Sequence, residues 1–215
     1  MGVWSRTAKA RRTKRCSRPG PHDGFSEYKG LSRPRLLSCV VIPAMQTPST
    51  STTIFHLEML DRDAFCPKAA PSGFDVAMVS PPNPEINRRF YCTVGSAWNW
   101  TDRLEWSEED WHRYVLRDGL RTWVGRLDGQ SVGYFELESQ GDGNVEIAYF
   151  GLLPEFIGRG LGGPLLSEAI ERAWNLSDTR RVWVHTCTDD HKHALDNYGK
   201  RGFEVFKTEQ IQQQV

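Results

Sequence analysis

Between a predicted strand and a predicted amphipathic helix, the chain reads Ile157-Gly-Arg-Gly-Leu-Gly-Gly163. Backbone N–H groups in such a turn, together with the positive end of the following helix dipole, form a site suited to an anion such as a diphosphate. Glycine suits this position because a side chain would hold the anion away from the backbone. An ordinary flexible turn would show the same glycines, so the loop alone leaves both interpretations open.

The segments on either side of this loop predict a strand, a crossover helix and a second strand. Residues 145–152 form a strand-like run before the loop, and apolar residues recur at helical spacing between Leu161 and Trp174 after it. Residues 181–187 then begin with a continuous apolar run, which is typical of a strand buried on both faces. Because a helix connects them, we expect the two strands to be parallel.

The chain before residue 145 has an antiparallel pattern. Residues 120–127 and 130–138 are separated by Asp128-Gly129, a strong hairpin signal, and the turn at 140–144 leads into the next strand. Further elements are expected at residues 54–60 (strand), 84–98 (helix), from Ser107 (helix), 193–201 (helix) and 203–207 (strand). The sequence therefore predicts an α/β (α+β) domain with a mixed central sheet, in which an antiparallel meander precedes a parallel β-α-β pair and helices cover both faces.

Composition is that of a soluble globular protein. The 215 residues suffice for one enzyme-sized domain with its own core. Hydrophobic residues make up 39% and charged residues 25%, the mean hydropathy is −0.53, and no run reaches the roughly 20 apolar residues of a spanning helix. The five cysteines never form C-x-x-C, so no disulfide framework or thiolate zinc site is predicted and a cytoplasmic location is expected.

Basic residues gather at the N-terminus although the net charge is zero. Residues 1–44 hold ten Lys or Arg and only two Asp or Glu. We expect a basic, disordered extension over 1–44, a Thr/Ser/Pro-rich linker over 45–52 and the folded domain over 53–215. Nucleic-acid binding is not predicted for the acidic body, and the basic arm alone leaves it open.

Two nucleotide-binding interpretations of the loop fail on context. Gly158, Gly160 and Gly163 satisfy G-x-G-x-x-G, but that dinucleotide fingerprint should directly follow its strand and open a long βαβ series. Here residues 153–156 intervene, and too little chain follows to build a doubly wound sheet. A P-loop is excluded because no G-K-[S/T] follows the glycines.

The order of the elements, the loop Pro154-Glu-Phe-Ile-Gly-Arg-Gly-Leu-Gly162 and the later segment Asn197-Tyr-Gly-Lys-Arg-Gly-Phe203 together resemble the GNAT superfamily of acyl-CoA-dependent N-acyltransferases. The family's Q/R-x-x-G-x-G/A pattern places its glycines on Gly160 and Gly162. The chain departs from the pattern at Ile157, which replaces Gln or Arg. The resemblance covers about residues 53–208 and is strongest after residue 120.

The resemblance implies acetyl-CoA as the acyl donor and no metal. The pyrophosphate would lie on the loop amides, and the pantetheine arm would lie between two splayed parallel strands, here 145–152 and 181–187. A backbone N–H near Leu152 would polarise the thioester carbonyl. The expected cofactor-binding residues are Leu152, Leu153, Ile157, Gly158, Arg159, Gly160, Leu161, Gly162, Gly163, His191 and Asn197.

Glu146 is the expected general base. It lies eleven residues before Ile157, the spacing at which some GNAT enzymes place a base glutamate, and strand alternation puts it on the face of Ala148 and Phe150. An alkylammonium must lose a proton before it attacks, and a carboxylate can carry that proton away. A solvent-facing glutamate at a strand start is the alternative.

Tyr198 is the expected general acid toward the leaving thiolate, because it matches the family's tyrosine before Gly-Phe. A helix tyrosine that packs against the sheet is the alternative. By the same resemblance, Asn197 would hydrogen-bond the cofactor arm, and His191 stands where the family commonly has Asn.

Two further groups of residues invite a chemical interpretation. A metal cluster is suggested by His185, Cys187, Asp189, Asp190, His191 and His193, but the spacing of these residues does not fit one, and Cys187 is expected to be a buried strand residue, not a nucleophile. An aromatic and acidic pocket for a cationic amine is suggested by Trp98, Trp100, Trp106, Trp111, Asp102, Glu105, Glu108, Glu109 and Asp110. Helix capping and core packing explain most of the second group equally well.

The predicted function is transfer of an acetyl group from acetyl-CoA to a primary amine, on a small molecule or a peptide, by direct attack in a ternary complex. One alternative is a non-catalytic acyl-CoA-binding or regulatory domain of the same fold, which the departure at Ile157 favours. The other is an NAD-dependent oxidoreductase. No membrane partner is expected, and a homodimer is left open.

Overall fold

The computed structural model describes residues 50–96, 98 and 100–213. The predicted basic extension and residues 45–49 of the predicted linker lie outside these residues. In chain order the elements are β1 (Thr50–Met59), η1 (Arg62–Ala64), β2 (Phe74–Met78), α1 (Pro84–Gly95), α2 (Glu108–Val115), β3 (Leu120–Leu127), β4 (Gln130–Ser139), β5 (Asn144–Leu152), η2 (Pro154–Phe156), α3 (Gly162–Trp174), β6 (Arg181–Cys187), α4 (Ala194–Gly199) and β7 (Glu204–Gln213).

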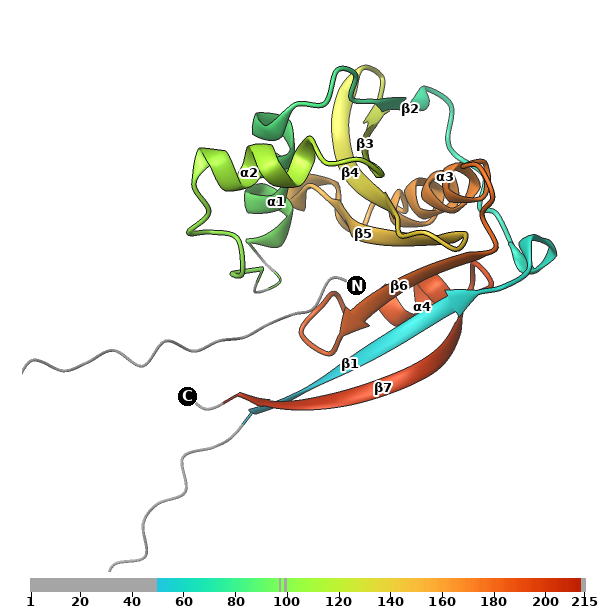
Figure 1. Cartoon of the computed structure of the whole chain (residues 1–215). Coiled ribbons are helices and arrows are strands. Elements are labelled where there is room, and N and C mark those ends of the chain that lie inside the picture. Colours follow the sequence, from blue (N-terminus) through green and yellow to red (C-terminus); the bar gives the residue numbers. More distant parts are fainter. Residues whose placement is uncertain (1–49, 97, 99, 214–215) are drawn as a thin grey trace, which may run out of the picture. The chain divides into compact units, whose positions relative to one another are not determined.

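Seven strands form one mixed sheet in the order β2-β3-β4-β5-β6-β1-β7 (Figure 1). The strands β2 to β5 are a meander of antiparallel neighbours, with the hairpin turn at Asp128-Gly129. The strands β5 and β6 pair in parallel across the crossover helix α3. The sheet confirms the predicted fold class, because the antiparallel meander and the parallel β-α-β unit both occur where they were expected.

The strand β1 takes a position that the sequence does not predict. It lies between β6 and β7 and is antiparallel to both, with Leu57 opposite Val184 on one side and Val205 on the other. The first strand of the chain therefore joins the last two, far from the meander that follows it in sequence. The short strand β2 is also absent from the sequence prediction, and it pairs with β3 at the opposite edge.

One face of the sheet is covered by α3 and α4. Leu165, Leu166, Ala169 and Ile170 of α3 are fully buried against apolar residues of β4, β5, β6 and β1. Tyr198 of α4 belongs to the same core. Helical spacing of apolar residues in α3 thus gives the largest core of the molecule, as its amphipathic pattern predicts.

The other face is covered only in part. The helices α1 and α2 pack over β3, β4 and β5 through clusters that contain Phe90, Tyr91, Trp111 and Tyr114 (Figure 1). The prediction that residues 181–187 are buried on both faces is wrong: Val182, Val184 and Thr186 are buried, whereas Arg181, Trp183, His185 and Cys187 are half-buried. The reason is that α1 and α2 cover this face of the sheet only as far as β5.

Two glycines near the end of α4 give a matched test of this architecture. The helix α4 ends at Gly199, earlier than the predicted Arg201, and Gly202 lies in the turn that follows it. Gly202 has φ at +100°, and a Cβ there would lie 2.0 Å from the carbonyl oxygen of Ala64. A Cβ at Gly199, inside α4, would meet no atom within 4 Å. We expect Gly202→Ala to lower the free energy of unfolding by about 2 kcal/mol or more, through backbone strain and the clash.

The control, Gly199→Ala, should be neutral or should stabilise the protein by roughly 0.5 kcal/mol, because alanine restricts the unfolded chain and fits a helix. Denaturant unfolding of both variants and the original chain measures the difference. Equal midpoints for the two variants would contradict the packing of Gly202 against the loop at Ala64.

Candidate active site

The two parallel strands pair over only a short length. Asn144, Val145 and Glu146 of β5 lie opposite Arg181, Val182 and Trp183 of β6. Beyond these pairs, β5 runs on to Leu152 and β6 to Cys187 without further β5–β6 pairing in the residues described. The strands therefore separate toward their carboxyl ends, the end at which the glycine loop follows β5.

A β-bulge in β5 decides which side chains share a face. Ile147 lies opposite Leu137 and Tyr149 lies opposite Glu136, so Ala148 is an extra residue between them. Phe150 consequently packs with Ile147 in the core beneath α3, whereas Tyr149 faces α1 and α2. The prediction that Glu146 and Phe150 share a face is wrong, because the bulge reverses the alternation after Ile147.

Glu146 is held in place by polar neighbours. Its side chain accepts a hydrogen bond at Oε2 from Nε2 of Gln140, and Oε1 lies 3.4 Å from Nδ1 of His185. Gln140 in turn accepts a bond of 2.9 Å from the indole of Trp183. The residue is only 9% exposed, so the alternative of a solvent-facing strand glutamate does not describe it.

The glycine loop presents free backbone donors. Gly158 and Gly160 have φ values of +80° and +78°, and α3 begins at Gly162 without a side-chain cap. Within the described residues, the N–H groups of Gly158, Gly160, Gly162 and Gly163 donate to no protein group. Leu161 is buried and anchors the loop against Phe156 and Val132. Free amides at an uncapped helix N-terminus are the kind of geometry that suits an anion.

Two cationic side chains that sequence reasoning missed lie beside this loop. Lys68 donates from Nζ to the carbonyl oxygen of Gly160 at 3.5 Å, and its backbone N–H donates to Ser167 Oγ at 2.8 Å. Nε and Nη1 of Arg201 are buried and have no hydrogen-bond partner in the part of the chain described. A Cβ at Gly163 would lie 2.5 Å from Cδ of Lys68 and 3.0 Å from Nη1 of Arg201, so a side chain there would displace these two cationic side chains.

The sequence held a signal for only one of these two residues. Arg201 lies inside the Asn197–Phe203 segment that carries the family resemblance, whereas Lys68 lies in a stretch without a motif. Together they add positive charge beside the free amides. Two buried guanidinium nitrogens that have no partner among the described residues, next to a helix N-terminus, fit a diphosphate better than they fit a plain turn.

Tyr198 and Asn197 place α4 against the loop and β5. Asn197 Nδ2 donates to the carbonyl oxygen of Gly162 at 3.4 Å, and the Tyr198 ring centre lies 6.3 Å from that of Phe150. Burial and then the nearby Asp190 carboxylate raise the pKa of Tyr198, so its phenol stays protonated at neutral pH. His191 makes a ring contact with Trp98, with centres 5.4 Å apart.

The remaining predicted cofactor residues occupy the loop and its approach. Leu152 ends β5, and the N–H of Leu153 already donates to the carbonyl oxygen of Val132 at 2.9 Å. Ile157 is half-buried, and the exposed Arg159 lies over the Phe156 ring at 5.0 Å. Leu153 therefore has no free N–H to give a thioester carbonyl, which leaves that expected role to an amide near Leu152.

The aromatic and acidic residues proposed as an amine pocket are already packed with one another. The Arg103 guanidinium lies over the rings of Trp106, Tyr114 and Tyr149 at 4.5, 3.8 and 4.4 Å. Asp102 accepts from Tyr91 at 2.7 Å. Glu108, Glu109 and Asp110 form the first turn of α2, whose capping box at Ser107 is confirmed. These contacts support the structural interpretation of this group.

Three other chemical interpretations receive no support from the geometry. Across the described ranges, no group of three or more His, Cys, Asp or Glu residues could hold a metal ion. Burial, followed by the Asp190 charge, raises the pKa of Cys187, which disfavours a thiolate nucleophile. The loop with the G-x-G-x-x-G pattern follows a strand of a largely antiparallel sheet. A dinucleotide site requires a doubly wound parallel sheet instead.

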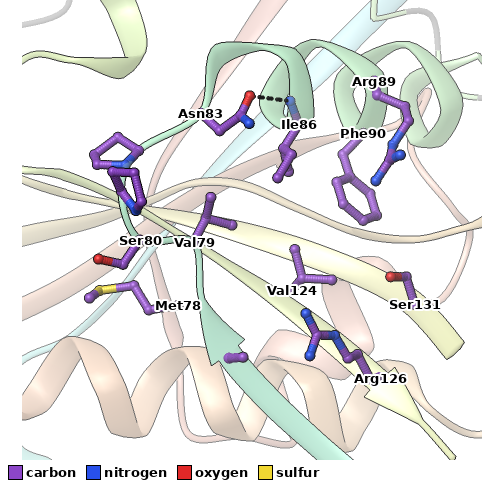
Figure 2. A pocket seen from close by; sticks show the side chains of 13 residues that line it. Met78, Val79, Ser80, Asn83, Ile86, Arg89, Phe90, Val124, Arg126 and Ser131 are labelled. Atoms are coloured by element: carbon purple, nitrogen blue, oxygen red, sulfur yellow. Dashed lines mark hydrogen bonds between the residues drawn. The ribbon is translucent and has the colours of Figure 1, made fainter. Parts of the chain in front are cut away.

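A cavity of about 370 Å³ lies elsewhere in the molecule (Figure 2). It is bounded by β2, the start of α1 and the neighbouring part of β3, with Arg89 and Arg126 at its side. None of the predicted site residues lines it.

Among the described helices, none is both long and apolar enough to cross a membrane.

Comparison with known proteins agrees with this geometry. The model of the acetyltransferase (GNAT) family matches residues 84–203. No curated protein sequence matches the chain. A GCN5-related N-acetyltransferase from Kribbella flavida is 21% identical with a TM-score of 0.54, over 74% of this chain and 58% of the other. One from Sphaerobacter thermophilus is 18% identical with a TM-score of 0.57, over 75% and 51%.

An aminoglycoside acetyltransferase from an uncultured soil metagenomic sample is 13% identical with a TM-score of 0.50, over 60% of this chain and 87% of the other. At these identities the solved structures show the shared fold, and this chain spans little more than half the length of the first two. The family match covers more than half of the chain. The chain belongs to the GNAT acetyltransferase family.

Proposed function

We propose that this protein transfers an acetyl group from acetyl-CoA to a primary amine, by direct attack in a ternary complex. One observation carries the proposal: β5 and β6 stop pairing after Glu146 and Trp183, and the loop that follows β5 ends in amides beside Arg201 that have no partner among the residues described. An extended thioester could lie between the strands while its diphosphate reaches the loop.

The diphosphate would be held by the amides of Gly158, Gly160, Gly162 and Gly163. Arg201 would supply charge-assisted hydrogen bonds from Nε and Nη1, which have no partner in the described part of the chain, and Lys68 would add a second charge. Backbone donors do not require the side chain that Ile157 replaces. The donor set therefore fits a diphosphate despite the departure from the family pattern.

The acceptor amine has to be deprotonated before it attacks. An alkylammonium with a pKa of about 10.4 pays roughly 4.6 kcal/mol to become a free amine at neutral pH. Glu146, oriented by Gln140 and close to His185, is the proposed base that takes this proton. A base next to the bound amine lets the proton leave as the new C–N bond forms.

The leaving thiolate would be met by Tyr198. Its buried phenol has a raised pKa and stays protonated, so it can donate a hydrogen bond or a proton to the departing sulfur. The rings of Tyr198 and Phe150 lie in the core beneath α3, whereas Glu146 points to the opposite face of the sheet. A substrate placed between the separated strands would therefore have the base on one side and the acid on the other.

The proposed acceptor class is a primary amine on a small molecule or a peptide. One matched solved structure is described as an aminoglycoside acetyltransferase, which supports a small-molecule amine as the first class to test. The non-catalytic alternative keeps one supporting observation, Ile157 in place of Gln or Arg. Binding of acetyl-CoA without turnover of any amine would favour that alternative.

The proposed function makes two predictions, and the first concerns the donor site. Calorimetric titration of the full chain with acetyl-CoA should show binding, and Arg201→Gln should weaken it roughly tenfold to a hundredfold, because charged hydrogen bonds to phosphate are lost. Lys200→Gln is the matched control. Lys200 precedes Arg201 in the sequence, but its side chain is exposed and pairs with Asp196. Equal affinities for the two variants would remove Arg201 from the site, and no binding by the folded original chain would overturn the proposed function.

The second prediction separates chemistry from binding. Tyr198→Phe should lower kcat about a hundredfold or more while the acetyl-CoA Kd stays nearly constant, because only the hydroxyl is lost. Tyr134→Phe is the control, since that hydroxyl is buried without a hydrogen-bond partner among the described residues. Steady-state kinetics with a responsive amine measures both variants, and an unchanged kcat for Tyr198→Phe would exclude Tyr198 from the mechanism.

A further inference from the structure

A row of four titratable side chains crosses the part of the sheet that α1 and α2 leave uncovered. Glu146 of β5 lies 3.4 Å from His185 Nδ1 of β6, and His185 lies opposite His56 of β1 with ring centres 6.0 Å apart. His56 Nε2 lies 3.7 Å from Glu209 of β7. Four strands thus contribute one residue each to a row in which two imidazoles lie between two carboxylates.

Aromatic packing fixes the two imidazoles. Trp183 lies 6.2 Å from the His185 ring and 6.4 Å from the His56 ring, and Phe206 meets His56 edge-on at 5.9 Å. These rings lie on the same face as Glu146. The histidine side chains therefore keep their order along the row and do not swing freely at the surface.

Exposure rises along the first step of the row. The Glu146 side chain is 12% exposed and the His185 side chain 31% exposed. A proton held on Glu146 has little direct contact with solvent, whereas an imidazolium at His185 can exchange with water. The arrangement therefore gives a proton on the buried carboxylate a route to solvent on the uncovered face of the sheet.

The other charges around the row are already paired. Arg181 bonds to Glu58 at 2.6 Å, Arg117 bonds to Glu138 at 2.6 Å, and Lys207 pairs with Glu209. Burial is the main cause that lowers the pKa of His56, and Glu209 opposes it only in part. A neutral His56 beside His185 does not repel an imidazolium there.

Acetyl transfer to an ammonium needs such a proton route. In this reaction the N–C bond forms, the C–S bond breaks and the sulfur leaves as a thiol. The ammonium gives up two protons during the reaction. One proton ends on the thiol, and the other must leave the site. Glu146 can accept this proton but must release it before the next turnover. Nδ1 of the His185 imidazole lies 3.4 Å from Oε1 of Glu146, where its lone pair can accept this proton.

We propose that His185 is a positioning and proton-accepting residue that acts through Glu146: it orients the carboxylate, takes over the proton that Glu146 has removed from the acceptor, and releases it to solvent. This inference rests on the proposed function. In this proposal His185 does not touch the acceptor itself. His56 is its neighbour in the row and, being neutral, does not oppose a positive charge on His185.

The test compares His185→Gln with His112→Gln, which removes an exposed histidine from α2. Turnover of acetyl-CoA is measured with spermidine, an aminoglycoside and a lysine-containing peptide as acceptors. We expect His185→Gln to lower kcat roughly a hundredfold, the lower end of what a proton-transfer group contributes, with little change in the acceptor KM or the acetyl-CoA Kd. The pH at which kcat falls off on the acid side should also move in this variant and not in the control.

A second variant distinguishes proton transfer from packing. His185→Ala should regain turnover when imidazoles are added to the assay, and the regain should follow the basicity of the imidazole used. An unchanged kcat for His185→Gln, or a lowered kcat with no change in the pH profile and no rescue of His185→Ala, would overturn the inference and leave the proposed function standing. If the original chain turns over none of the three acceptors, the proposed function fails first and this inference fails with it.

Discussion

The loss of pairing between β5 and β6 is the constraint on which the site depends. Parallel strands that stay paired leave no room for a substrate between them, but here pairing ends at Glu146 and Trp183. The helix α3 still packs against both strands and keeps them in one sheet. The separation therefore coexists with a continuous core beneath it, and the glycine loop lies at the open end.

The second feature of the molecule is an unevenly covered sheet. The helices α3 and α4 bury one face, whereas α1 and α2 cover the other face only as far as β5. Because β1 enters between β6 and β7, it brings His56 next to His185 on the uncovered part. The same insertion closes the core through Leu57 and Met59, so one strand serves the packing on one face and the polar row on the other.

Local sequence patterns predicted most elements because their causes are local. The hairpin follows from Asp128-Gly129, the start of α2 from the capping box at Ser107, and α3 from its apolar periodicity. The glycine loop and the segment around Tyr198 were found because they form compact motifs. The bulge at Ala148 was missed, since Val145, Ile147 and Tyr149 keep a regular alternation in the sequence that the folded strand interrupts.

The sequence alone predicted the class of sheet, the glycine loop and the family resemblance, because each depends on residues close together in the chain. Contacts between distant segments required the folded molecule. Lys68 meets the loop across nearly a hundred residues, and His56 faces His185 through strand insertion. Nε and Nη1 of Arg201 are buried without a partner among the described residues. Side-chain approach across such distances is set by how the elements pack, and packing has no signature in a short stretch of sequence.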